Sequence, residues 1–168
     1  MNEKILKEKI QRVLNECQKH KQRILEASED LEKFMPLDEK SYKSLSKDEV
    51  QALDQFLFRF SKLQDAMERK LFKLVLILKE GDEEFVNSLN FIDILNHLEK
   101  MKILYTKQWQ ELRDIRNELA HNYDDDSQEM AEILNIIYVK KDVLLQVLEN
   151  ISNYIKNVNL TESVDKNR

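Results

Sequence analysis

Residues 111–123, with the sequence ELRDIRNELAHNY, hold the side chains best suited to chemistry in this chain. Arg116, His121 and Tyr123 follow the order Arg, four residues, His, one residue, Tyr, directly before an acidic run. A histidine can take up or return a proton at neutral pH, which makes His121 a candidate general acid or base. Arg116 offers a fixed cation with forked donors, which suits a developing anion better than a lysine does. Tyr123 could orient a substrate or stack on a base.

This spacing sets a geometric condition on any site that uses both Arg116 and His121. Five positions along a continuous α-helix turn through about 500°, so the two residues lie about 140° apart around the axis and about 7.5 Å apart along it. One helix alone therefore does not bring the two side chains together. Either the chain leaves helical geometry near His121, which the run at 123–126 favours, or two protomers bring their motifs together at a symmetric interface.

Other kinds of site are excluded or poorly supplied. Gly81 is the only glycine, so the chain cannot build a Gly-rich loop for nucleotide phosphates or the glycine pair around a nucleophilic serine. The three histidines lie far apart with no metal-binding spacing, and we expect neither a metal site nor a cofactor. Cys17 is the only cysteine and lies on an apolar stripe, where we expect a small buried hydrophobic residue.

The spacing of apolar residues is helical almost throughout, and glycine and proline are nearly absent. A capping box at Ser46 and Glu49 predicts the start of a long helix, and Gly81 is its natural stop. The expected segments are a helix at 4–27, a connector at 28–47, a long helix at 47–80, a short helix at 83–89, helices at 91–103 and 106–121, a helix at 126–158 and a frayed polar tail at 159–168. The prediction is one all-α domain over residues 1–168, an up-and-down helical bundle of about five helices.

Charge and apolar content bear on partners and on location. There are 27 basic and 32 acidic residues, which give a net charge of −5, so contact with nucleic acid would have to be local. The longest apolar run, residues 74–78, is too short to span a membrane, and the first ten residues alternate in charge instead of forming a signal core. With one cysteine and no possible intrachain disulfide, a cytoplasmic location without membrane contact is expected.

Residues 47–158 resemble the HEPN superfamily, in particular the helical partner of minimal nucleotidyltransferases in bacterial and archaeal toxin–antitoxin pairs. The Arg116, His121 and Tyr123 spacing carries the resemblance, and Asn117 matches the polar residue that typically follows the arginine in that family. Residues 123–125 are similar to its Tyr-Asp-acid run. Residues 58–60, Phe-Arg-Phe, resemble its Gln-Arg-Phe element with Phe in place of Gln, and the continuation at 66–70 departs from the family pattern. The resemblance implies a four-helix core to which residues 1–46 add an N-terminal helix and a connector.

The resemblance also implies a function, a homodimeric, metal-independent endoribonuclease toxin whose Arg116 and His121 meet across the two-fold axis. His121 would move a proton at the ribose 2′-hydroxyl or at the leaving oxygen, and Arg116 would stabilise the phosphorane. Tyr123, Asn117 and Arg113 are the candidate substrate-binding residues. In this branch the cognate nucleotidyltransferase adenylylates the motif tyrosine, which would be Tyr123, and the added AMP would block the cleft.

Three other interpretations stay open. The chain could be a non-catalytic, substrate-binding partner of a nucleotidyltransferase, or a purely structural helical adaptor. The motif could also be an ordinary helix end, in which Arg116 pairs with Glu111 or Asp124, His121 serves the helix terminus and Tyr123 packs.

Overall fold

The computed structural model describes residues 1–121 and 126–167. Over these residues the chain is helical and has no strand, so the prediction of an all-α bundle is confirmed. The elements in chain order are α1 (Glu3–Leu31), α2 (Glu39–Lys43), α3 (Lys47–Ala66), the π-helical turn η1 (Met67–Leu71), α4 (Phe72–Glu80), α5 (Glu83–Ser88), α6 (Phe91–Lys100), α7 (Thr106–His121) and α8 (Ser127–Lys166).

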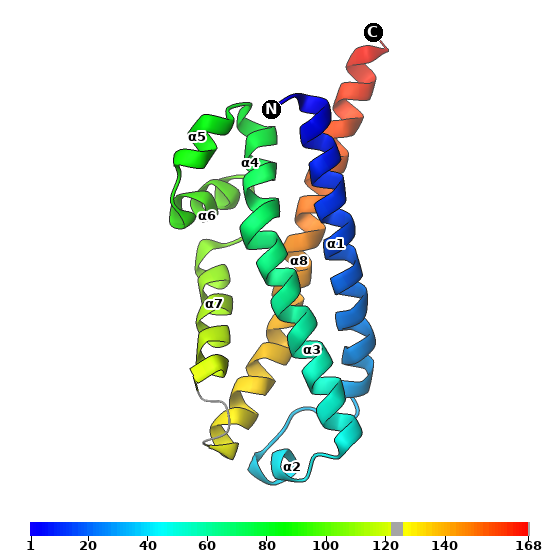
Figure 1. Ribbon diagram of the computed structural model, residues 1–168, viewed down its shortest axis with the longest axis vertical. Coiled ribbons are helices and arrows are strands. Elements are labelled where there is room, and N and C mark those ends of the chain that lie inside the picture. Colours follow the sequence, from blue (N-terminus) through cyan, green and yellow to red (C-terminus); the bar gives the residue numbers. More distant parts are fainter. Residues whose placement is uncertain (122–125, 168) are drawn as a thin grey trace.

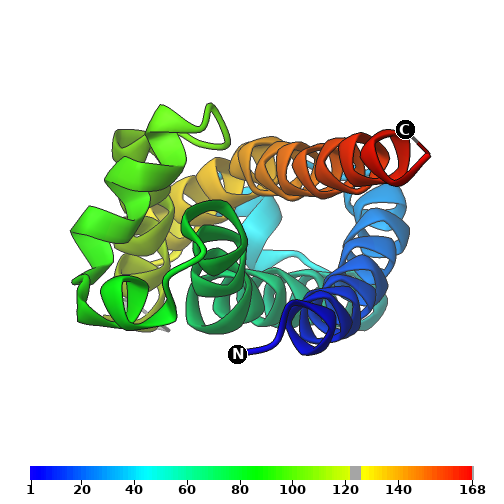
Figure 2. The same ribbon diagram turned by 90° about the horizontal axis from the view of Figure 1, so that it is seen from above.

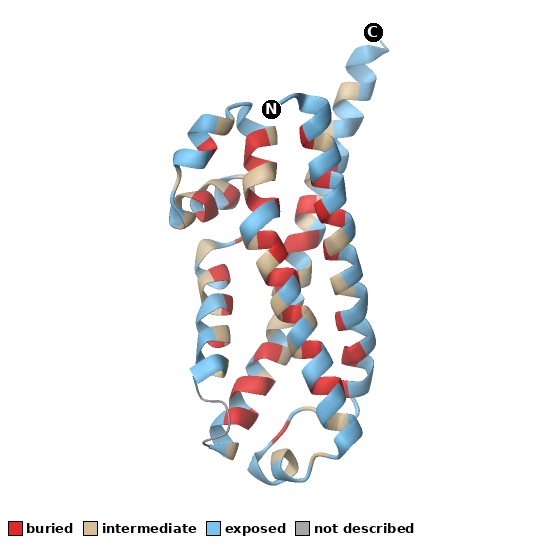
Figure 3. Ribbon diagram, viewed as in Figure 1, coloured by how far each residue is buried: buried red, intermediate tan, exposed pale blue. Residues whose placement is uncertain are grey.

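Four long rods run alternately up and down the molecule (Figure 1). They are α1, the continuous rod of α3, η1 and α4, then α7, and finally α8, while α5 and α6 turn the chain between the second and third rods. Each rod carries buried residues (Figure 3), and their side chains form one hydrophobic cluster that includes residues of α1. None of the described helices has the length and apolar character needed to cross a membrane.

The long rod begins and ends where the sequence predicts. The Oγ of Ser46 accepts from the backbone N–H of Glu49 at 3.2 Å, and the Glu49 carboxylate accepts from the backbone N–H of Ser46 at 2.9 Å. At the other end Gly81 has a φ of 69°, the left-handed conformation that a glycine adopts most easily. The rod is not uniform, because residues 67–71 form a π-helical turn that the apolar spacing did not reveal.

The N-terminal segment is more ordered than expected. The helix α1 continues to Leu31, four residues beyond its predicted end, because Leu31 is itself fully buried. The connector contains the short helix α2, which starts with a capping box at Asp38. The side chain of Asn135 on α8 fixes the connector, since it accepts from the backbone N–H of Leu37 at 2.7 Å and donates to its carbonyl at 2.8 Å.

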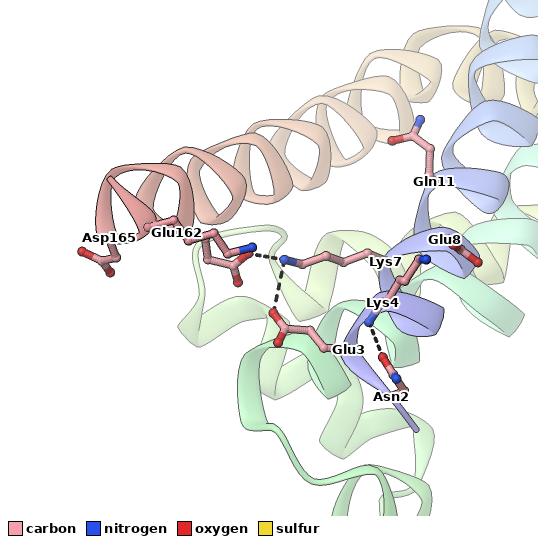
Figure 4. Close-up of a pocket in the computed structure, with 9 residues that line it drawn as sticks. Asn2, Glu3, Lys4, Lys7, Glu8, Gln11, Glu162 and Asp165 are labelled. Atoms are coloured by element: carbon pink, nitrogen blue, oxygen red, sulfur yellow. Dashed lines mark hydrogen bonds and ion pairs between the residues drawn. The ribbon is translucent and has the colours of Figure 1, made fainter. Parts of the chain in front are cut away.

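The prediction of a frayed tail at 159–168 is wrong for residues 159–166, which belong to α8. Residues of the start of α1 and of the end of α8 meet there, where the Lys7 ammonium is paired with the carboxylates of Glu3 and Glu162 (Figure 4). Contacts of this kind hold a polar helix end in place although its apolar periodicity has ended.

Cys17 is fully buried, as predicted, and burial raises the pKa of its thiol from 9.0 to about 12. In the unfolded chain the thiol ionises at an ordinary pKa, so the stability that comes from keeping it neutral is present below about pH 9 and is lost as the pH rises toward 12. Between pH 8 and pH 10 the free energy of unfolding should fall in the wild type, and we expect it to fall by about 1 kcal/mol less in Cys17→Ala. The measurement is urea unfolding of both proteins at both pH values. Equal losses in the two proteins would contradict this account of the thiol.

Candidate functional site

The helix α7 carries the described candidate residues and packs on the bundle through its inner face. Trp109, Leu112 and Ile115 on that face are buried. The helix continues without a break through His121, so the chain does not leave helical geometry before this residue. Arg116 and His121 are therefore held about 140° apart on one rigid rod, and one protomer does not bring them together.

Arg116 is paired with an acid from a different helix. Its Nη1 donates to Oδ1 of Asp65 on α3 at 3.0 Å. Of the two local partners considered from the sequence, Glu111 is paired with Lys140 at 3.3 Å instead, and Asp124 lies outside the described residues. The side chains of Arg116 and Asp65 are 25% and 36% exposed, so this ion pair contributes no more than about 1 kcal/mol.

Arg116 also lines a shallow groove of about 430 Å³ between α3 and α7. The apolar part of the lining includes Leu57 and Phe58 from α3 and Leu119 from α7. Phe58 is 54% exposed, which is unusual for a large aromatic side chain. The groove thus combines a cation with an aromatic edge, an arrangement that can hold a phosphate and a flat ring at once.

Arg113 lies in a second polar cluster, centred on Glu68 of the π-helical turn. Oε1 of Glu68 accepts from Nε1 of Trp109 at 2.8 Å and from Nε2 of Gln64 at 3.3 Å, and it lies 3.6 Å from Nε of Arg113. The Arg113 guanidinium also lies over the ring of Phe91, 4.4 Å from its centroid. Sequence reasoning missed Glu68, because the apolar residues keep steps of three and four across the π-helical turn and give no signal of it.

His121 and Asn117 are exposed on the same stripe of α7 as Arg113, since the three follow one another at steps of four. No other described residue forms a hydrogen bond or an ion pair with the side chain of His121 or of Asn117. Tyr123 lies outside the described residues. Arg116 thus contacts α3, Arg113 contacts η1 and α6, and His121 is open to an approaching molecule.

Among the described residues, no three His, Cys, Asp or Glu side chains are grouped so that they could hold a metal ion. No family model, no curated protein and no solved structure matches this chain.

Proposed function

We propose that this chain is a metal-independent endoribonuclease of the HEPN type, which cleaves RNA with Arg116 and His121. The observation that carries the proposal is the surface of α7, on which an exposed histidine without a described partner stands one and a half turns from an arginine that lines a groove. A general acid or base has to be reachable by substrate, and a phosphate-binding cation has to face a space that the phosphate can enter.

The chemistry assigns one role to each residue. The ribose 2′-oxygen attacks the neighbouring phosphorus, a bond forms between them, and the bond from phosphorus to the 5′-oxygen breaks. His121 takes the proton of the 2′-hydroxyl or returns one to the leaving 5′-oxygen. Arg116 stabilises the charge of the phosphorane with its forked donors, and Tyr123 orients the substrate.

A homodimer completes the site in this proposal. Because α7 is continuous through His121 and holds its own Arg116 about 140° away, the proposal pairs the histidine of one copy with the arginine of another. The exposed stripe of Arg113, Asn117 and His121 offers a polar surface on which two copies of α7 can meet around a two-fold axis. A cognate nucleotidyltransferase would restrain the enzyme by adenylylating Tyr123, as the resemblance implies.

A second candidate function is supported by the ion pair of Arg116 with Asp65, because an arginine neutralised by an acid binds phosphate less well. In this alternative the chain is a non-catalytic partner subunit of a nucleotidyltransferase. It predicts a stable complex with that enzyme and no cleavage of RNA.

The proposal is tested by incubating the purified chain with single-stranded RNA in the presence and in the absence of EDTA. We expect cleavage at the same rate in both, because the mechanism uses no metal. RNA that stays intact in both conditions, together with stable binding to a nucleotidyltransferase, would favour the second candidate. Cleavage that EDTA abolishes would contradict both.

Asp65→Asn is expected to tighten the binding of RNA by about fivefold, because it removes the negative charge that competes with phosphate for Arg116. The measurement is fluorescence anisotropy of labelled single-stranded RNA, made in a His121→Ala background so that the RNA stays intact. Asp54→Asn is the matched control, since Asp54 lines the same groove without pairing with Arg116. Weaker binding in the Asp65 variant would show that Asp65 positions the arginine and does not mask it.

A further inference from the structure

A depression of about 470 Å³ between α1 and α4 is lined by an unusual number of cations. These are Lys9 and Arg12 from α1, Arg69 and Lys70 from the π-helical turn, and Lys73 from α4. Figures 1 and 2 show the two helices side by side at this point. In a chain with a net charge of −5, the depression is a local reversal of sign.

The acids that face the depression do not neutralise it. Glu16 lines it and is paired with Lys70 at 3.1 Å, and Glu83 lines it and is paired with the amino group of Met1 at 3.2 Å. The other four cations have no described ion-pair or hydrogen-bond partner: Lys9, Arg12, Arg69 and Lys73. Cations held together without counter-charges repel one another, so this surface is suited to a ligand that carries several negative charges.

The positive surface continues down the junction of α1 and α3 through a series of contacts. Glu16 lies 3.8 Å from Nε2 of His20, and Nη1 of Arg59 donates to Nδ1 of the same ring at 3.1 Å. Arg59 and Lys62 both lie over the ring of Phe58, each 5.5 Å from its centroid. We name the whole row the basic seam, and it consists of Lys9, Arg12, Arg59, Lys62, Arg69, Lys70 and Lys73.

Phe58 joins the basic seam to the groove of Arg116. The same ring that carries Arg59 and Lys62 also lines the groove between α3 and α7. From Arg59 to Lys73 the helical rod rises about 21 Å, which is the length of several nucleotides of an extended strand. A flexible polyanion that lies along the basic seam would therefore pass the exposed ring of Phe58 and reach the groove of Arg116.

We propose that the basic seam binds the phosphates of single-stranded RNA and that Phe58 stacks on a base where the strand turns into the Arg116 groove. The identity of the polyanion as RNA rests on the proposed function, whereas the binding surface rests on its own residues. A row of cations with an aromatic ring at its end is the usual arrangement for binding single strands. An anionic membrane fits less well, since the cations line a depression between two helices and not one face of a single amphipathic helix.

The test is the binding of a labelled 20-nucleotide single-stranded RNA to full-length protein in the His121→Ala background, at several salt concentrations. One variant combines Lys9→Gln, Arg12→Gln, Arg69→Gln and Lys73→Gln. The matched control removes the same charge from exposed lysines elsewhere and combines Lys40→Gln, Lys47→Gln, Lys107→Gln and Lys156→Gln. A third variant is Phe58→Leu, and vesicles with anionic lipids serve as the competing ligand.

We expect the seam variant to bind RNA more than tenfold more weakly at 0.1 M salt, with a salt dependence that falls by roughly 0.7 for each lost phosphate contact. Phe58→Leu is expected to weaken binding by about tenfold, and the scattered control by less than about threefold. Equal losses in the seam variant and in the control would overturn the proposal, and so would seam-dependent binding of vesicles without binding of RNA.

If wild type cleaves RNA while the seam variant binds and cleaves normally, the seam proposal fails alone. If the wild type binds RNA but never cleaves it, and the seam variant no longer binds RNA, the proposed function fails alone.

Discussion

Replacing His121 with Ala is expected to lower the rate of RNA cleavage at least about a hundredfold, because a positioned acid or base contributes a factor of this size or more. The same change should alter the free energy of unfolding by less than about 0.5 kcal/mol, since the ring is exposed at the end of α7 and no other described residue bonds to it. Cleavage is measured by gel analysis of end-labelled RNA, and stability by urea unfolding.

His97→Ala provides the matched control for this prediction. His97 lies on α6, is half-buried and has its ring edge-to-face against that of Phe85, with 5.9 Å between the centroids, and it does not line the groove of Arg116. Its replacement should leave cleavage unchanged and lower stability slightly. Cleavage that survives in the His121 variant would remove the histidine from the mechanism, whatever the control shows.

Trp109→Ala is expected to lower the free energy of unfolding by about 3–5 kcal/mol, the largest change in stability among the substitutions considered. The indole is 1% exposed and packs edge-on against Phe72 at 4.8 Å. Its N–H donates to the Glu68 carboxylate at 2.8 Å, so the substitution also leaves that acid short of one donor.

Trp109→Phe separates the hydrogen bond from the packing. The phenyl ring keeps most of the buried contact but has no N–H, so we expect a smaller loss of about 1–3 kcal/mol. In a Glu68→Gln background this loss should shrink, because the charged acceptor is already gone. Losses that add without coupling would show that the bond between Trp109 and Glu68 contributes nothing to stability.

The fold was largely predictable because the helices follow from local rules. The capping box at Ser46, the left-handed stop at Gly81 and the N-cap at Asp126 each act within four residues of a helix end, and each lies where the sequence indicates. The π-helical turn and the helical tail at 159–166 were not predictable in this way. The π-helical turn adds a residue without changing the apolar composition of the rod. The tail at 159–166 is held by contacts such as that between Lys7 and Glu162, which are more than 150 positions apart.

The site was predictable only in its residue types. The spacing of Arg116 and His121 defines the angle between them on a helix, and the continuous α7 keeps that angle. The partner of Arg116 could not be read from the motif, because Asp65 lies 51 positions away and meets it through the packing of α3 on α7. The contacts of Arg113 could not be read from the motif for the same reason, since Glu68 and Phe91 belong to other elements.

The central claim is that Arg116 of one copy works with His121 of another. It is tested most directly by mixing Arg116→Ala protein with His121→Ala protein, unfolding the mixture in urea and refolding it so that subunits exchange. Each mixed dimer then contains one site with both residues intact, so we predict that cleavage returns to about a quarter of the wild-type rate although each variant alone is inactive. A mixture that stays inactive while mixed dimers are present would contradict the shared site.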